Sequence, residues 1–169
     1  MPQLTGQQIA ALITAFTVAA AAAFGYLVFG SANSSVEAAD LLAALRGWQA
    51  AYSAAGYQYG AAALNSAVIT NSHKVDPAIV SGTDMLSRWG TKIIWTGAGT
   101  NLVAALTAVP NNNCVEIMTD ASLAPVLVSI GITSGTARVP GPNIDPATAA
   151  TDCGSSGTVA LTATFNGHP

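Results

Sequence analysis

Charged residues are scarce in this chain of 169 residues. Only 8% of the residues are charged, five Lys and Arg against eight Asp and Glu, whereas soluble domains average roughly 25%. So few cations form no basic patch for phosphates, which excludes binding of nucleic acid by the monomer on charge grounds. Apolar residues make up 51% of the chain, and this share excludes an intrinsically disordered protein.

The motifs of common enzyme classes are also absent. The sequence contains no G-x-S-x-G, no GK[ST] phosphate loop, no HExxH and no CxxC pair. Its two histidines, His73 and His168, are far apart in sequence and are interpreted as solvent-exposed side chains. Beyond residue 40, the carboxylates are scattered singly, as Asp76, Asp84, Glu116, Asp120, Asp145 and Asp152. The sequence therefore predicts no catalytic, cofactor-binding or metal-binding residues, although two carboxylates could still meet in space.

The N-terminal segment is the most apolar part of the chain. Residues 1–36 contain no charged side chain, and the run from Ile9 to Gly30 is interrupted only by Thr14 and Thr17. Because about 20 apolar residues span a bilayer core, this run predicts a transmembrane helix. Small residues recur every four positions within it, at Ala11, Ala15, Ala19 and Ala23, a spacing that lets helices approach closely. Two interpretations follow: a plain membrane anchor, or a helix that packs against copies of itself.

A cleavable secretory signal is the alternative for the same segment. Gly30 and Ala32 resemble a small-x-small cleavage site. However, residues 1–8 carry no positive charge, and the apolar run is longer than the usual core of about 7–15 residues. We therefore expect the segment to be retained.

The helical pattern continues beyond the apolar run. Leu41, Leu45, Trp48 and Tyr52 are spaced as one face of a helix, which we expect to pack in a core. One long helix is predicted over residues 4–55. A local break is predicted between residues 20 and 31, because Gly25 and Gly30 each weaken a helix by roughly 1 kcal/mol relative to Ala.

The remainder predicts an α+β head. Strands are predicted over residues 92–95, 101–109, 125–133 and 158–165, where apolar and polar residues alternate or β-branched residues gather. Residues 96–99 are expected to connect the first two strands as a hairpin. Helices are predicted over 61–68 and over 111–120, the latter with an Asn cap. Residues 73–89 and 135–151 are rich in turn signals and are expected to be mostly irregular.

Two cysteines, Cys114 and Cys153, lie in the head. An even count after an export-type helix suggests one disulfide. It would close a loop of about 40 residues, worth about 4 kcal/mol in the chain-entropy description. Two buried free thiols are the alternative, and a metal site is disfavoured because no histidine pair lies nearby.

Taken in order, these features resemble the type IV pilins, specifically the type IVb group and its PilS-like major pilins. The resemblance covers essentially the whole chain. The segments that carry it are the junction Ser31–Ser35, Ser81–Met85 followed by Trp89-Gly90, Val109–Cys114 at the start of a helix, and Cys153-Gly154 before the last strand.

The resemblance implies a fold: a long N-terminal α-helix with a hydrophobic first half, packed against a small globular head with an antiparallel β-sheet. It implies a stalk over residues 1–36 and a head over residues 37–169. It also implies a Cys114–Cys153 disulfide that bounds an exposed region, residues 114–153. The stalk side chains implied to form a filament core are Ile9, Leu12, Ile13, Phe16, Ala19, Ala23, Phe24 and Leu27.

The resemblance also implies a function, that of a structural subunit without enzymatic activity or cofactor. Pilins are processed by a prepilin peptidase, so Met1 would be the mature and methylated first residue. Subunits wait in the inner membrane and are polymerised by an assembly machinery into an extracellular filament of identical copies. Most pilins have a glutamate near the fifth mature position, where Thr5 stands here, and the usual proline within the apolar run is also missing.

The same sequence features are compatible with other functions. Within the family, the alternatives are a minor pilin and a type II secretion pseudopilin. Outside it, the alternative is a monomeric, membrane-anchored binding domain. An anchored hydrolase is disfavoured because its motifs are absent.

Overall fold

The computed structural model describes residues 35–71, 75–135, 137–138, 144–155 and 157–169. Some predictions concern residues outside these ranges. They are the start of the long helix, its break at Gly25 and Gly30, the stalk residues, Met1 and His73. In the described part of the chain, no helix combines the length and apolar character needed to cross a membrane.

The first described helix covers residues 35–52 and passes into a short 3₁₀ turn, η1 (Ser53–Ala55). Gly56 ends it in the left-handed conformation, with φ 65°, a conformation that glycine adopts without steric cost. Leu41, Leu45 and Trp48 are buried, whereas Tyr52 is half-buried against the same core. The predicted stripe therefore packs against the head, and the predicted helix end at Ala55 is confirmed.

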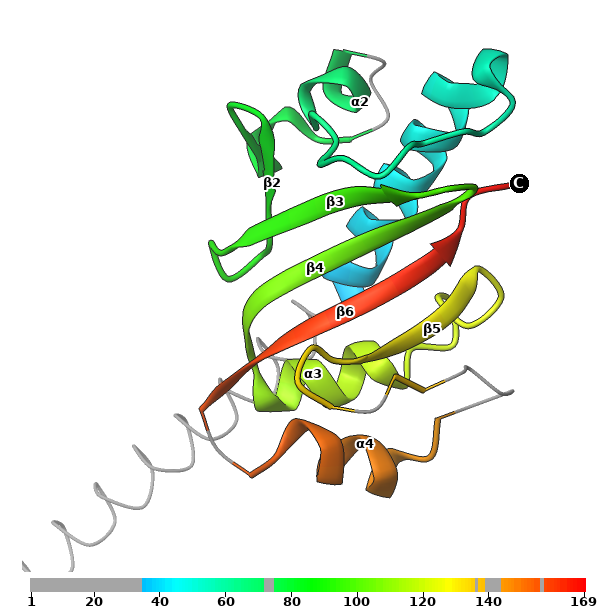
Figure 1. Ribbon diagram of the computed structural model, residues 1–169. Coiled ribbons are helices and arrows are strands. Elements are labelled where there is room, and N and C mark those ends of the chain that lie inside the picture. The colour runs from blue at the N-terminus through cyan, green and yellow to red at the C-terminus, as the bar shows by residue number, and fades with distance from the viewer. Residues whose placement is uncertain (1–34, 72–74, 136, 139–143, 156) are drawn as a thin grey trace, which may run out of the picture.

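One antiparallel sheet of six strands forms the body of the head (Figure 1). Its order is β1-β2-β3-β4-β6-β5. The strands are β1 (Val80–Ser81), β2 (Asp84–Leu86), β3 (Lys92–Ala98), β4 (Asn101–Pro110), β5 (Leu127–Ile132) and β6 (Thr158–Asn166). The last strand pairs with both β4 and β5, so it joins the two halves of the sheet. The predicted α+β class with a helix against an antiparallel sheet is confirmed.

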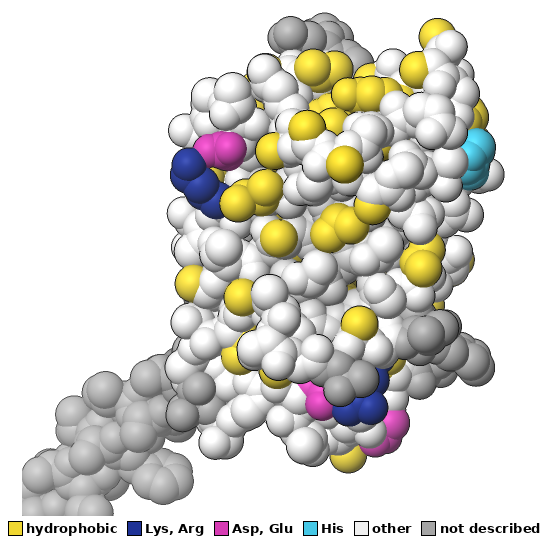
Figure 2. Space-filling model, viewed as in Figure 1, with side chains coloured by type: hydrophobic (Ala, Val, Ile, Leu, Met, Phe, Trp, Pro, Cys, Tyr) yellow, Lys and Arg dark blue, Asp and Glu magenta, His cyan; other side chains and the backbone are white. Residues whose placement is uncertain are grey.

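The core lies between the first helix and one face of this sheet. Burial alternates along β3, β4 and β6, as expected when one face is covered and the other faces water. Trp95 and Phe165 stack within the core, their ring centroids 5.6 Å apart. Figure 2 shows the opposite face, where charged side chains gather near one edge and at the lower end and are sparse over the sheet between.

The hairpin and the segment before it differ from the predictions. Residues 96–98 belong to β3, and the turn is Gly99-Thr100, because Ala98 pairs with Asn101. Residues 61–66 form no helix. They run along the edge of β3, where the Leu64 N–H donates to the Trp95 carbonyl at 2.8 Å. Gly97 permits this approach, since a Cβ there would lie 2.5 Å from the Tyr59 carbonyl oxygen.

Four further elements differ from the sequence predictions. The short helix is α2 (Ala67–Asn71), displaced toward the C-terminus from its predicted position. The expected loop over 73–89 contains η2 (Pro77–Ile79) and strands β1 and β2. These strands are only two or three residues long. β2 pairs with β3 and β1 pairs with β2, and this pairing rather than an alternating pattern defines them.

Two helices cover the lower end of the sheet in Figure 1. The first, α3 (Asn111–Met118), lies where predicted, but its N-cap residue is Pro110 and no side chain caps it. The second, α4 (Pro146–Cys153), overlaps residues 135–151, which were expected to be mostly irregular. Three prolines suggested that irregularity, yet Pro146 occupies the first helical turn, where a missing N–H costs nothing.

Candidate functional site: the disulfide-bounded region

A disulfide joins α3 to α4 and defines the disulfide-bounded region, residues 114–153. Cys114 and Cys153 are bonded, their Cα atoms 6.0 Å apart and their sequence separation 39 residues. Both cysteines are fully buried, and no free cysteine occurs in the described residues. The suggested disulfide is therefore present, and the free-thiol and metal-site alternatives are wrong.

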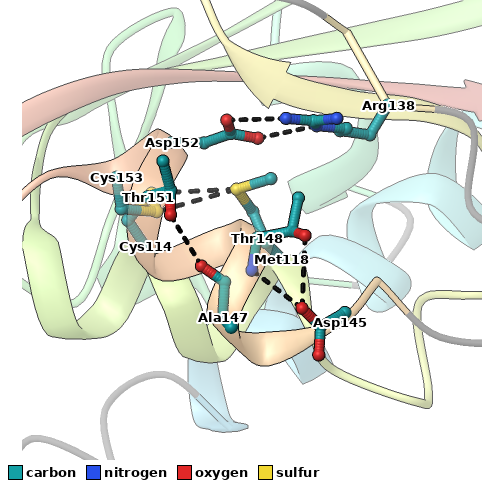
Figure 3. Close-up of polar contacts among 9 residues, drawn as sticks. All are labelled: Cys114, Met118, Arg138, Asp145, Ala147, Thr148, Thr151, Asp152 and Cys153. Atoms are coloured by element: carbon teal, nitrogen blue, oxygen red, sulfur yellow. Dashed lines mark hydrogen bonds and ion pairs between the residues drawn. A yellow bond between two sulfur atoms is a disulfide. The ribbon is translucent and has the colours of Figure 1, made fainter.

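A third sulfur lies against this bond (Figure 3). The Sδ atom of Met118 is 3.6 Å from Sγ of Cys153 and 4.0 Å from Sγ of Cys114. Met118 sits one turn after Cys114 on α3 and is itself buried. This packing shields the disulfide from water on the α3 side.

Polar contacts fix the ends of α4. The Asp145 carboxylate accepts hydrogen bonds from the Thr148 N–H at 3.0 Å and from its hydroxyl at 3.2 Å, which caps the N-terminus. At the other end, the Asn111 side-chain amide donates to the Cys153 carbonyl at 2.6 Å. The asparagine expected to cap its own helix therefore binds the end of the neighbouring one.

An ion pair ties α4 to the segment that follows β5. The Arg138 guanidinium donates two hydrogen bonds to the Asp152 carboxylate, at 2.7 and 2.8 Å (Figure 3). Arg138 also exchanges backbone hydrogen bonds with Ile130 at 2.8 and 2.9 Å. The Arg138 hydrogen bonds hold the pKa of Asp152 below its usual range, and the same contact raises the pKa of Arg138.

Replacing Arg138 should raise the pKa of Asp152. In Arg138→Gln, we expect the pKa of Asp152 to rise toward its ordinary value, because the guanidinium hydrogen bond is the largest cause of the lowering. The stabilising effect of the pair is present above the ordinary aspartate pKa and is lost as pH falls through the lowered one. Carboxyl-detected NMR titration would measure the shift. Arg46→Gln is the control and should leave the pKa of Asp152 unchanged.

The singly scattered carboxylates do not form a catalytic cluster. Among the described residues, no three His, Cys, Asp or Glu side chains gather as metal ligands would. Asp76 and Asp145 cap short helices, Asp120 accepts hydrogen bonds from Ser122, and Asp84 pairs with Lys92. His168 is exposed, with its ring against Tyr57, so its predicted exposure is confirmed.

One buried carboxylate was missed by sequence. Glu37 is fully buried, and its Oε2 accepts the Arg88 backbone N–H at 2.7 Å, while its Oε1 lacks a hydrogen-bond partner in the described structure. The Arg88 guanidinium itself pairs with Asp40 at 2.5 Å. Burial raises the pKa of Glu37 to about 7, and Asp40 adds to the rise, while the Arg88 contacts oppose it. A signal was available, because Glu37 precedes Leu41 by one helical turn and so shares the buried face.

The contacts of Arg88 with Glu37 and Asp40 hold the first helix to the turn between β2 and β3. The Ser87–Thr91 turn is closed by a 2.7 Å backbone bond from the Ser87 N–H to the Thr91 carbonyl. Arg88 lies within it and reaches both Glu37 and Asp40. The end of the helix nearest the apolar segment is therefore fixed to the sheet.

Comparison with known proteins gives distant structural similarity. No model of a protein family matches the chain. No curated protein matches it either. Among solved structures, a type IVb pilin from Salmonella typhi is similar, with 21% sequence identity and a TM-score of 0.38 over 70% of this chain and 76% of that chain. A similarity this distant assigns no function, so the function rests on the residues of this chain.

Proposed function

We propose that the chain is a structural subunit, a major pilin of the type IVb kind, that polymerises into an extracellular filament. One observation carries this proposal: the helix that leads from the uncharged segment is itself part of the core of the head. Leu41, Leu45 and Trp48 of that helix are each at most 1% exposed. The helix that follows the apolar run in sequence is therefore packed into the head from Glu37 onward.

The division of charge supports the same proposal. The stalk, residues 1–36, has no charged side chain, whereas every Asp, Glu, Lys and Arg lies in the head, residues 37–169. Copies of an uncharged helix can pack together without burying an ion, whose desolvation costs several kcal/mol. Small residues at four-residue spacing favour such packing. The heads would then form the polar surface of the filament.

The disulfide-bounded region is proposed as part of that surface. Asp145, Ala147, Ala150 and Thr151 of the α4 segment are exposed, while the disulfide and the Arg138–Asp152 pair hold the segment in place. Subunits would wait in the inner membrane, where a prepilin peptidase and an assembly machinery act on them, and Met1 would become the methylated first residue. The proposal includes no enzymatic activity.

A charge placed in the middle of the stalk tests the proposal. We expect Ala20→Asp to reduce filaments by at least tenfold, because each copy would bury an unpaired carboxylate in the filament core at a cost of several kcal/mol. Electron microscopy of sheared surface material from cells that express the full chain with its assembly machinery gives the count. Ala20→Ser is the matched control and should assemble normally.

Two results would contradict the proposal. Normal filament numbers from Ala20→Asp would mean that the stalk is only an anchor. Absence of filaments from the wild-type chain, with the protein present in the membrane as a monomer, would favour the membrane-anchored binding domain.

A further inference from the structure

Arg46 differs from the other described cations because it has no acidic partner. Arg88 pairs with Asp40, Lys92 with Asp84, and Arg138 with Asp152. Arg46 is exposed on the first helix, and the described part of the chain offers it neither an ion pair nor a hydrogen bond. An uncompensated guanidinium on a chain with net charge −3 is available to an external anion.

The surroundings of Arg46 form a groove rather than a flat surface. The groove has a volume of about 530 Å³ and lies between the first helix, the turn before β5 and the end of the chain after β6. Leu42, Leu45 and Val126 supply apolar lining, whereas Gln49 and His168 supply polar atoms beside Arg46. We name it the Arg46 groove. A hollow with an apolar lining and a few polar groups has the composition of a site that receives an anchor side chain of a partner.

Charge complementarity points to the occupant. Acidic residues outnumber basic ones in the head, and Asp76, Asp120 and Asp145 have no ion pair among the described residues. Asp76 and Asp145 are exposed, and Asp120 is partly exposed. Asp145 begins α4 at the lower end of the sheet in Figure 1, whereas the C-terminal residues that line the groove lie at the upper end. A second copy of this chain therefore presents the Asp145 carboxylate on a surface distinct from its own groove.

We propose that the Arg46 groove is a docking site for a second copy of this chain, in which the guanidinium pairs with a carboxylate of that copy. With Asp145 as the partner carboxylate, groove and carboxylate are different surfaces, so the contact is heterologous. Repetition of a heterologous contact gives an open helical assembly when the rotation does not close. This inference rests on the proposed function and assigns a head-to-head contact to the filament.

A charge-reversal series in the full chain tests the contact. We expect Arg46→Glu to reduce filament numbers by about tenfold, since it places like charges opposite each other at every copy of the interface. Ala51→Glu adds an acidic residue to an exposed site of the same helix outside the groove and should assemble normally. Thermal unfolding followed by circular dichroism should give the same melting temperature for both variants and the wild type.

Rescue identifies the partner carboxylate. Arg46→Glu is combined in turn with Asp76→Lys, Asp120→Lys and Asp145→Lys, and we expect one of the three pairs to restore filaments. Wild-type filament numbers from Arg46→Glu alone, or no rescue by any pair, would overturn the inference while leaving the proposed function intact.

If the wild-type chain forms no filaments, the proposed function fails, and sedimentation of the detergent-solubilised chain then decides the docking contact. Self-association that weakens with salt and is lost in Arg46→Glu would support it. A monomer at every salt concentration would overturn it.

Discussion

Removal of the disulfide, in Cys114→Ala combined with Cys153→Ala, is expected to lower the free energy of unfolding by about 4 kcal/mol. The bond spans 39 residues of sequence, and opening a loop of that length returns about this much chain entropy to the unfolded state. The loss is comparable to the lower end of the total stability of a typical domain, about 5 kcal/mol. Denaturant unfolding of the purified full chain in detergent would measure it.

The loss of stability in the double cysteine variant should be largest in the disulfide-bounded region. Apart from the disulfide, α4 is held by the Asn111 contact, by the Arg138–Asp152 pair and by its packing on α3. Hydrogen exchange should therefore accelerate in α3 and α4 more than in β3 and β4. Met118→Leu is a matched control, because it removes the sulfur beside the bond but retains the loop closure. Equal unfolding free energies for the double variant and the wild type would show that the bond contributes nothing to stability.

The stability of the wild-type head should fall by about 3 kcal/mol between pH 4.5 and pH 7 through Glu37 alone. Burial raises the pKa of this carboxyl from 4.5 to about 7 in the folded state, and a tenfold change in proton affinity corresponds to about 1.4 kcal/mol of free energy. The folded protein then holds a proton that the unfolded chain releases. The resulting stabilisation is complete below pH 4.5 and is lost as pH rises through about 7.

Glu37→Gln tests this dependence because it removes the ionisation. The amide oxygen can still accept the Arg88 N–H, which Oε2 accepts in the wild type, so the contact with the turn is retained. We expect the unfolding free energy of the variant to change little between pH 4.5 and pH 7, whereas that of the wild type decreases. Asp40→Asn is the control and should keep most of it, since Asp40 is a smaller cause of the raised pKa than burial. Identical pH profiles for Glu37→Gln and the wild type would exclude Glu37 as the titrating group.

Local patterns in the sequence determined the class of the fold and its longest elements. The helical stripe of Leu41, Leu45 and Trp48 and the alternation in β6 are set by neighbours a few residues away, so they are visible without the fold. Cysteine number suggested the disulfide for a similar reason, because two cysteines allow only one pairing. The separation of an uncharged stalk from a charged head is likewise a property of the sequence alone.

The tertiary structure decided features that depend on distant partners. β2 pairs with the edge of β3 and in turn pairs with β1, and residues 61–66 run along β3 instead of forming a helix. The raised pKa of Glu37 results from burial beneath a turn 51 residues away in the sequence. Arg46 differs from Arg88, Lys92 and Arg138 in that the described part of the fold brings no carboxylate beside it. Burial and ion pairing are sums over neighbours that the fold brings together, so residue types and spacing along the chain do not contain them.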